Sequence, residues 1–318
     1  MILNGSDMYL GGFFTTVRGT TRNYAACVDS DPAQASPALR AWNPDCSGRV
    51  RSMLLSGPDM YLGGDFITVR GATRNRAACV DSDPAQASPA LRAWNPDCSN
   101  SVYSMLLNGS DMYLGGLFTA VSGTARNRAA CVDSDPSQAA PALRAWNPDC
   151  DNRVWSMLLS GSNMYLGGAF TTVRGITRNY AACVDSNPTQ ASPALRAWNP
   201  DCSSTVLSMI LNGSDMYLGG QFTTVSGITR NRAACVDSNP AQASPALRAW
   251  DPDCDNAVNP MILNGSDMYL GGGFTTVGVS DRLCIAAVDS DPDMNILLNF
   301  DLELNGGVTT LVMSEANP

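Results

Sequence analysis

Short apolar runs and turn residues alternate along the whole chain. Between Val50 and Cys98, four runs at 50–55, 60–62, 76–81 and 90–94 are separated by segments of Gly, Pro, Asp and Ser. These four residue types favour turns, and no window shows a sustained apolar period of 3.6 residues. The pattern therefore predicts four short antiparallel strands in this stretch and no helix.

The same pattern occurs six times. Copies begin at Met1, Met53, Met105, Met157, Met209 and Met261, giving repeats 1–52, 53–104, 105–156, 157–208, 209–260 and 261–318. Four short strands in a repeat of this length are typical of one propeller blade. An open β-solenoid is the alternative, but its coils are usually shorter and it needs distinct caps. We expect an all-β, six-bladed β-propeller of four-stranded antiparallel blades with a 52-residue repeat, forming one domain over residues 1–318.

Glycine marks two places in each copy. Asn4-Gly5 lies between two predicted strands, where a type I′ hairpin turn needs positive φ at both central residues. Asn-Gly-Ser is also an N-glycosylation acceptor, but two copies replace the Asn with Ser56 and Ser160 and keep the Gly, which favours the turn. The doubled glycine, such as Gly63-Gly64, predicts a bulge or a close approach of neighbouring blades.

Ten of the eleven cysteines recur in pairs nineteen residues apart, and the sixth copy lacks both members of its pair. Pairing within a blade explains the joint loss, whereas pairing between blades would leave two cysteines without partners. We therefore expect five disulfides and an oxidising compartment, with Cys284 left over. A metal site is the weaker interpretation, because two thiols without His would need sharing between blades to reach four ligands. The expected pairs are Cys27/Cys46, Cys79/Cys98, Cys131/Cys150, Cys183/Cys202 and Cys235/Cys254.

Composition narrows the chemistry. The chain has no His and no Lys, all twenty basic residues are Arg, and the net charge is −9. This charge argues against nucleic acid as a partner, and no apolar stretch is long enough to span a bilayer. No nucleophile–base pair or motif-placed carboxylate pair is present, so we expect no enzyme activity and no cofactor. The repeated Asp29 and Asp31 could contribute to a Ca²⁺ site, but Asx turns at the strand end explain them better.

One stretch of each copy resembles a known repeat. The segment from Gly63 to Ala78, GGDFITVRGATRNRAA, followed by Trp94-Asn95-Pro96, is similar to the delta-60 repeat, with its GG-F-x-x-V-x-G-x-x-R-N core and a later aromatic-x-Pro. The resemblance covers all six copies, the sixth being degraded after Val277. It implies a β-propeller, commonly in large bacterial surface or secreted proteins, and implies no catalytic residues. The paired cysteines and the Asp-Pro-rich loop depart from that pattern.

The copies differ at a few positions only. These positions are the start of the first strand, the residue after the doubled glycine and the start of the third strand, and in an antiparallel meander all three lie at one edge of the sheet. We name them together the variable face, and the buried-type aromatics such as Trp94 are instead assigned to packing. Tyr, Trp and Arg commonly anchor interfaces, so we expect ligand binding here, with neutral drift at exposed sites as the alternative. The candidate binding residues are Arg51, Tyr103, Trp155, Asp65, Tyr24, Arg76, Arg128, Tyr180 and Arg232.

The terminal segments suggest a second possibility. Residues 308–313 resemble the first strand of a repeat, and Met1-Ile2-Leu3 resembles the end of that strand. The C-terminal strand could complete the first blade, or it could add to a neighbouring molecule's sheet and form a homopolymer. The N-terminus reads as the middle of a repeat and not as a signal peptide, so we expect processing or another export route.

Together these features predict a non-enzymatic extracellular or surface-displayed propeller that acts as a multivalent binding and scaffold module. Its expected partner is a protein or a glycan at the cell surface. A structural subunit of an extracellular filament or sheath, and a carbohydrate-binding lectin, are the alternatives.

Overall fold

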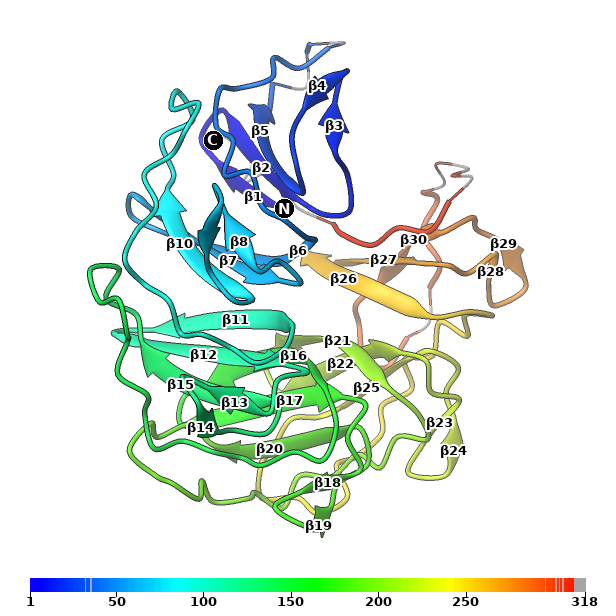
Figure 1. Cartoon of the computed structure of the whole chain (residues 1–318). Coiled ribbons are helices and arrows are strands. Elements are labelled where there is room, and N and C mark those ends of the chain that lie inside the picture. The colour runs from blue at the N-terminus through cyan, green and yellow to red at the C-terminus, as the bar shows by residue number, and fades with distance from the viewer. Residues whose placement is uncertain are drawn as a thin grey trace. The chain divides into compact units, whose positions relative to one another are not determined.

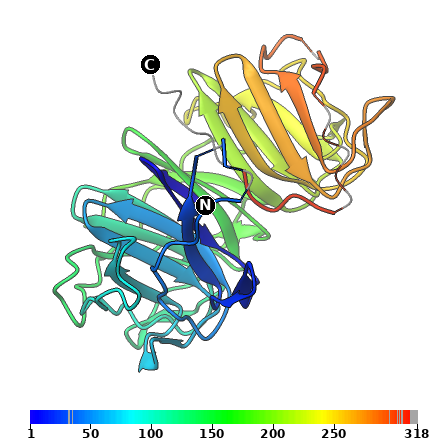
Figure 2. The same cartoon turned by 90° about the horizontal axis from the view of Figure 1, so that it is seen from above.

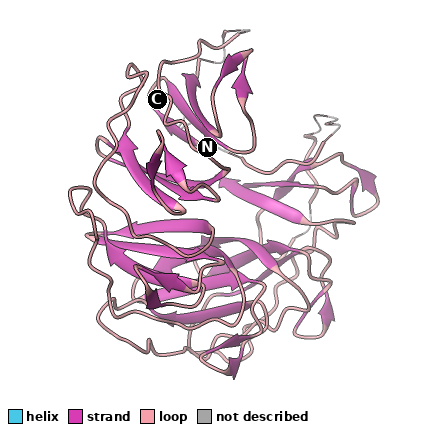
Figure 3. Cartoon of the chain, in the orientation of Figure 1, coloured by secondary structure: helices cyan, strands magenta, loops and turns pink. Residues whose placement is uncertain are grey.

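The computed structural model describes residues 1–31, 33–34, 36–294, 296–300, 302, 304 and 306–311. Across these residues the secondary structure is entirely strand, turn and loop (Figure 3), as the sequence pattern predicts. The described chain forms two compact units. The first comprises Met1–Asp149 and Pro188–Ser192, and the second comprises Cys150–Asn187 and residues 193–311. The division falls inside the predicted single domain.

Each 52-residue period supplies one three-stranded antiparallel sheet and one two-stranded hairpin (Figure 1), and from the second sheet on the first strand starts three residues before the repeat boundary. The first strands are β1 (Ile2–Asn4), β6 (Val50–Ser56), β11 (Val102–Asn108), β16 (Val154–Ser160), β21 (Val206–Asn212) and β26 (Val258–Asn264). The second strands are β2 (Asp7–Gly11), β7 (Asp59–Gly64), β12 (Asp111–Gly116), β17 (Asn163–Gly168), β22 (Asp215–Gly220) and β27 (Asp267–Gly272). The third strands are β5 (Ala25–Asp29), β10 (Ala77–Asp81), β15 (Ala129–Asp133), β20 (Ala181–Asp185), β25 (Ala233–Asp237) and β30 (Ile285–Asp289).

The hairpin lies in the segment that the sequence pattern assigns to a polar loop, between the second and third strands. Its two-residue strands are β3 (Thr16–Val17) and β4 (Thr20–Thr21), β8 (Thr68–Val69) and β9 (Ala72–Thr73), β13 (Ala120–Val121) and β14 (Thr124–Ala125), β18 (Thr172–Val173) and β19 (Ile176–Thr177), β23 (Thr224–Val225) and β24 (Ile228–Thr229), and β28 (Thr276–Val277) and β29 (Ser280–Asp281). Strands this short give too weak a periodicity to be detected from sequence.

The predicted fourth strand is reduced to a single bridge. In the second repeat Leu91 pairs with Val80, and the only ladder bonds are Asp81 N to Ala90 O at 2.8 Å and Arg92 N to Cys79 O at 2.9 Å. Two residues later the chain has left its own sheet, because Trp94 N donates to the carbonyl of Pro136 in the next repeat at 3.1 Å. The expectation of a full strand over 90–94 is therefore wrong: the segment must cross to its neighbour.

That crossing builds the core. Trp94 is fully buried, stands edge-on to Tyr61 with ring centroids 5.2 Å apart, and donates from Nε1 to the carbonyl of Asp133 at 2.8 Å. The acceptor belongs to the next repeat, so Trp94 joins two neighbouring sheets. The same arrangement recurs around Trp42, and within the first unit β6 and β11 lie side by side (Figures 1 and 2). The prediction that the repeated tryptophans serve packing is confirmed.

The doubled glycine does both things expected of it. A Cβ on Gly63 would lie 2.9 Å from Cγ1 of Val102 in the next sheet, so the first glycine allows close approach. A Cβ on Gly64 would lie 2.1 Å from the carbonyl oxygen of Arg49 at the β6–β7 bulge, where Val50 pairs with Gly64 but Ser52 pairs with Gly63. Any side chain at Gly64 would therefore displace backbone.

The hairpin turn between the first two strands is of another type than predicted. Ser56 pairs with Asp59, so the central residues are Gly57 and Pro58, and only Gly57 has positive φ, at 56°. A glycine with positive φ at the first central position is the type II′ pattern. Proline fixes φ near −65°, so Pro58 already rules out the type I′ turn in this copy.

Candidate functional site

The variable positions do lie at one edge of each sheet. Gly64 N donates to the carbonyl of Arg76 at 2.9 Å, which joins the end of β7 to the residue before β10. Asp65 N donates to the carbonyl of Arg49 at 2.8 Å, which joins the same point to the residue before β6. The predicted meeting of three strand ends is confirmed, and it places Arg51, Asp65 and Arg76 together.

In the first unit these positions enclose a cavity of ≈ 490 Å³. Its lining comes from the edges of two neighbouring sheets: Phe13 and Tyr24 adjoin β2 and β5 of the first, and Gly48, Arg49, Arg51 and Asp65 belong to or adjoin β6 and β7 of the second. We call this cavity the aromatic–arginine pocket. Three predicted binding residues, Tyr24, Arg51 and Asp65, lie in it.

The pocket has an apolar side and a charged side. Phe13 is 81% exposed and lies against Tyr24, with ring centroids 6.1 Å apart and ring planes inclined by 44°. The charged side holds an ion pair, in which Arg51 Nε is 2.8 Å from Oδ1 of Asp65. The Arg51 guanidinium also lies over the ring of Tyr103, 5.0 Å from its centroid, a cation–π contact that adds a fourth predicted residue to the cluster.

The charges in the pocket keep Asp65 ionised. Burial of this carboxyl acts to raise its pKa, but hydrogen bonds from Arg51 and Ser101 and the positive charges of Arg51 and Arg49 outweigh burial. The net effect lowers the pKa of Asp65 below its usual value. Arg51 and Asp65 therefore form an ion pair throughout the neutral range.

Residues before the third strand adopt a backbone conformation that the sequence did not reveal. Tyr24 has φ of 64° and Arg76 has φ of 69°, both in the left-handed region that costs a side-chain-bearing residue about 1–2 kcal/mol. Glycine would meet this backbone demand without strain, yet no copy has it at this position. The retained side chains point to a role that glycine cannot fill.

The arginines at this position have an internal role. Arg76, Arg128 and Arg232 each donate from Nη1 to the carbonyl of the residue after the doubled glycine in their own repeat, at Asp65, Leu117 and Gln221. These three predicted binding residues therefore brace the edge of their sheets. Tyr24 is different, because its ring contacts Phe13 and lines the pocket.

The two remaining candidates lie in the second unit. The guanidinium of Arg153 lies 5.6 Å from the ring centroid of Trp155. Tyr180 is half-buried and packs against the core cluster that contains Trp198 and Val206. Neither lines the aromatic–arginine pocket. The candidate list also omitted three of its lining residues, Phe13, Gly48 and Arg49. Phe13 was visible as the aromatic among residues following the doubled glycine.

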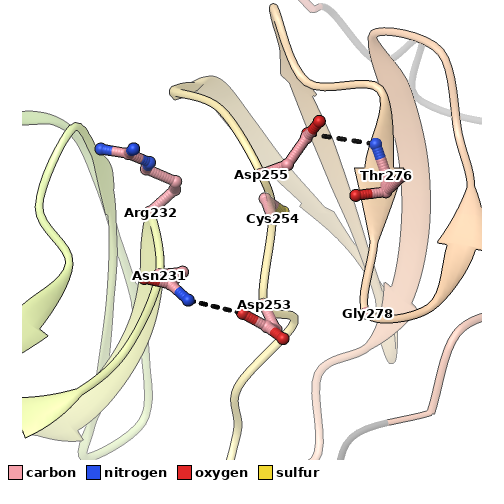
Figure 4. Close-up of a pocket in the computed structure, with 7 residues that line it drawn as sticks. All are labelled: Asn231, Arg232, Asp253, Cys254, Asp255, Thr276 and Gly278. Atoms are coloured by element: carbon pink, nitrogen blue, oxygen red, sulfur yellow. Dashed lines mark hydrogen bonds between the residues drawn. The ribbon is translucent and has the colours of Figure 1, made fainter.

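A second cavity of ≈ 310 Å³ lies in the second unit (Figure 4), lined by Asn231, Arg232, Asp253, Cys254, Asp255, Thr276 and Gly278. Asn231 Nδ2 donates to Oδ1 of Asp253 at 2.7 Å, and Thr276 N donates to Oδ1 of Asp255 at 3.1 Å (Figure 4). The Asn–Asp bond recurs in four other repeats, for example between Asn75 and Asp97 at 2.7 Å. This cavity is thus a part of the shared loop architecture.

The acidic loops form the predicted Asx turns. Asp29 Oδ1 accepts from Asp31 N at 2.8 Å, and Asp31 Oδ1 accepts from Ala33 N at 2.9 Å. The same pair of bonds recurs at Asp81 and Asp83. Within the described part of the chain, no group of three or more Asp, Glu or Cys side chains is placed to hold a metal ion.

The predicted disulfides are not formed. Cys79 lies on β10, whereas Cys98 pairs through its backbone with Val121 of the next repeat, so the nineteen-residue spacing reflects two separate packing roles. Burial raises the pKa of the Cys27 thiol to about 12 and that of Cys98 further, which keeps both protonated. The free and buried thiols are Cys27, Cys46, Cys79, Cys98, Cys131, Cys183, Cys202, Cys235 and Cys254; Cys284 is free and half-buried.

The C-terminal segment takes the place of a first strand without forming one. A Cβ on Gly271 would lie 2.7 Å from Cγ1 of Val308, as one on Gly63 would meet Val102, and Val308 N donates to the carbonyl of Gly272 at 2.9 Å. Residues 308–311 nevertheless have no strand pairing, which corrects the predicted strand over 308–313; its last two residues lie outside the described part.

No protein-family model matches the chain, and no curated protein matches it. The delta-60 resemblance therefore stays a prediction. In the part of the chain that the structure describes, no helix is long and apolar enough to cross a membrane.

Solved structures show similarity of fold. The WD40 β-propeller domain of Doa1 matches with a TM-score of 0.57 at 10% identity, covering 96% of this chain and 80% of that one. A computationally designed protein, Ika8, matches with a TM-score of 0.53 at 10% identity, covering 92% and 85%. With the all-β repeats, this likeness shows a β-propeller fold, and the six repeats fit six blades.

Proposed function

We propose that this chain is a non-enzymatic β-propeller that binds a protein partner through its variable face. The observation that carries the proposal is the aromatic–arginine pocket, which is assembled from positions where the copies differ. Five of the six repeats keep the tryptophan that packs between sheets, as at Trp94, whereas all six differ at the solvent-exposed position of Phe13. A surface that diverges while its scaffold stays constant suits recognition.

The pocket has the composition of an interface anchor. Aromatic residues and arginine are enriched at the centres of protein interfaces, and Phe13, Tyr24, Arg49 and Arg51 supply both kinds. The fold supports the same conclusion, since a WD40 propeller is among its structural neighbours.

The alternatives lack a comparable observation. The described residues of segment 308–311 form no strand that could extend a neighbouring sheet into a filament. A lectin needs side chains that satisfy many sugar hydroxyls, and the pocket lining offers no Asn or Gln and only Asp65, already bonded to Arg51. The disulfides that suggested an extracellular location are not formed, so the proposal concerns binding alone.

A photo-crosslinking amino acid placed at Phe13 tests the proposal. The matched control carries the same amino acid at Ser88, an exposed residue in the loop after β10, at the opposite end of the sheet. Both proteins are irradiated in an extract of the source cells. We expect discrete protein adducts from position 13 that excess unlabelled protein abolishes, and none from position 88. Equal labelling from both positions, or adducts that the competitor leaves unchanged, would contradict binding through the variable face.

A further inference from the structure

The aromatic–arginine pocket carries one uncompensated positive charge. Its lining holds two guanidinium groups, Arg49 and Arg51, and one carboxylate, Asp65. Asp65 forms an ion pair with Arg51, and among the described residues Arg49 forms an ion pair with no carboxylate. The Nε atom of Arg49 is buried without a hydrogen-bond partner. A positive pocket in a chain of net charge −9 favours an anionic ligand group.

An apolar surface lies beside that charge. Phe13 is 81% exposed. Among the large apolar side chains that are exposed in the described part of the chain, it is the one that carries an aromatic ring. Its contact with Tyr24 leaves most of the phenyl ring open to solvent, so a ligand that covers the ring removes apolar surface from water, which favours binding. The two rings and Arg49 line one cavity, so a ligand that reaches the charge also covers the aromatic ring.

We propose that the aromatic–arginine pocket binds an acidic peptide segment, with a Glu or Asp carboxylate on Arg49 and an adjacent apolar side chain against Phe13 and Tyr24. This assignment rests on the proposed function and names the chemistry of the partner at that site. Guanidinium groups recognise carboxylates through paired N–H donors, and Arg49 is free to do so because Arg51 already holds Asp65. An acidic sugar would share the charge contact but would bring hydroxyl groups that the lining does not satisfy.

The combination occurs once in the repeats. At the position of Phe13 the other copies have Asp65, Leu117, Ala169, Gln221 and Gly273, none of them aromatic. At the position of Arg49 the other copies have Ser101, Arg153, Thr205 and Ala257. These residues are compatible with the same local fold, so Phe13→Gln and Arg49→Ser remove one half of the pocket each with little risk to folding. Arg153→Ser, at the same repeat position in the second unit, is the matched control.

The test begins with a displayed library of random heptapeptides, selected on the full wild-type chain and counted against the Phe13→Gln variant. Enriched peptides are then synthesised with each acid replaced by its amide, and binding is measured by fluorescence anisotropy. We expect enriched sequences to place Glu or Asp beside an aromatic or aliphatic residue. Amide replacement and Arg49→Ser should each weaken binding about tenfold, as loss of a charge-assisted bond predicts, whereas Arg153→Ser should leave it unchanged.

The outcomes separate the two proposals. Enriched peptides that lack acids, or that bind the Arg49→Ser variant as tightly as the wild type, would overturn the acidic specificity and leave binding through the variable face standing. A library that yields nothing enriched on wild type over Phe13→Gln would overturn the acidic-peptide proposal, whereas the crosslinking test at Phe13 decides the proposed function by itself. Circular dichroism and thermal unfolding of each variant confirm that the fold is intact.

Discussion

A repeated arginine gives the sharpest test of the fold. It lies at the end of its sheet opposite to the variable face. Arg92 Nε lies 2.6 Å from Oδ1 of Asp59, and Nη2 lies 2.9 Å from Oδ2 of Asp81. The two aspartates are register partners on β7 and β10, so without the arginine they would face each other as like charges. In the fourth repeat Asn163 replaces the first aspartate, and Arg196 donates to its Oδ1 at 3.0 Å.

Replacing Arg92 with Leu, the residue that the sixth repeat has at Leu298, removes both ion pairs. Arg92 is 29% exposed and its partners 14% and 18%, so each pair contributes about 0.5–1 kcal/mol after solvent screening. Without the arginine, the repulsion between the carboxylates of Asp59 and Asp81 is no longer offset, and this adds about 0.5–1 kcal/mol to the loss of stability. We expect Arg92→Leu to lower the free energy of unfolding by about 2 kcal/mol.

Urea unfolding followed by tryptophan fluorescence measures the loss. In the matched variant Arg196→Leu, Asn163 carries no charge, so only one ion pair is lost and the cost should be about 1 kcal/mol. Asp59→Asn combined with Arg92→Leu should recover part of the loss, because it removes the repulsion. Equal costs for the two arginines, or strict additivity of the double variant, would refute this account of the network.

Three further predictions follow from packing and burial. Trp94→Phe keeps a ring contact like that of Phe300 in the sixth repeat but removes the hydrogen bond to the Asp133 carbonyl. Calorimetry should show that the free energy of unfolding falls by about 2–3 kcal/mol, and a decrease under about 1 kcal/mol would refute the role of that bond. Gly63→Ala places a methyl group against Val102 and should cost about 1–3 kcal/mol in urea unfolding, while an unchanged midpoint would show that the neighbouring sheet yields. Burial raises the pKa of the Cys98 thiol, so the unfolded chain loses that proton at a lower pH than the folded chain. The melting temperature should therefore be constant below about pH 8.5 and fall as the pH rises above it. A melting temperature that stays constant to about pH 10.5 would indicate that the thiol is not free.

Much of the fold was predictable because the same strand pattern occurs in six copies, and comparing the copies separates packing positions from variable ones. The spacing of apolar runs located the three main strands. The recurrence of Trp94 in five copies and of Gly63 in all six identified packing positions, because a residue packed between sheets admits few substitutes. The meeting of three strand ends followed from antiparallel order alone. The same strand order predicted that Tyr24, Arg51 and Asp65 belong to one face, and all three line the pocket.

The predictions that were wrong, the fourth strand and the cysteine pairing, depend on the path of the chain after a strand ends. The segment after Leu91 reads as a strand by composition, but it crosses to the next repeat within two residues, and this crossing also carries Cys98 away from the sheet that holds Cys79. A spacing of nineteen residues says nothing about such a path. Likewise, Arg76 and Tyr24 occupy one repeat position, and only the structure shows the first bonding to its own sheet and the second lining a pocket.

The sequence by itself therefore determined the repeating unit, its strand order and the edge where its copies diverge, because periodicity and alternation are properties of the chain. The tertiary structure decided which divergent residues form a site. The aromatic–arginine pocket combines Phe13 at the edge of one sheet with Arg49 at the edge of the next, and its unbalanced charge arises because Arg51 has already taken Asp65. Contacts between side chains from different sheets depend on distances that no pattern along one chain encodes.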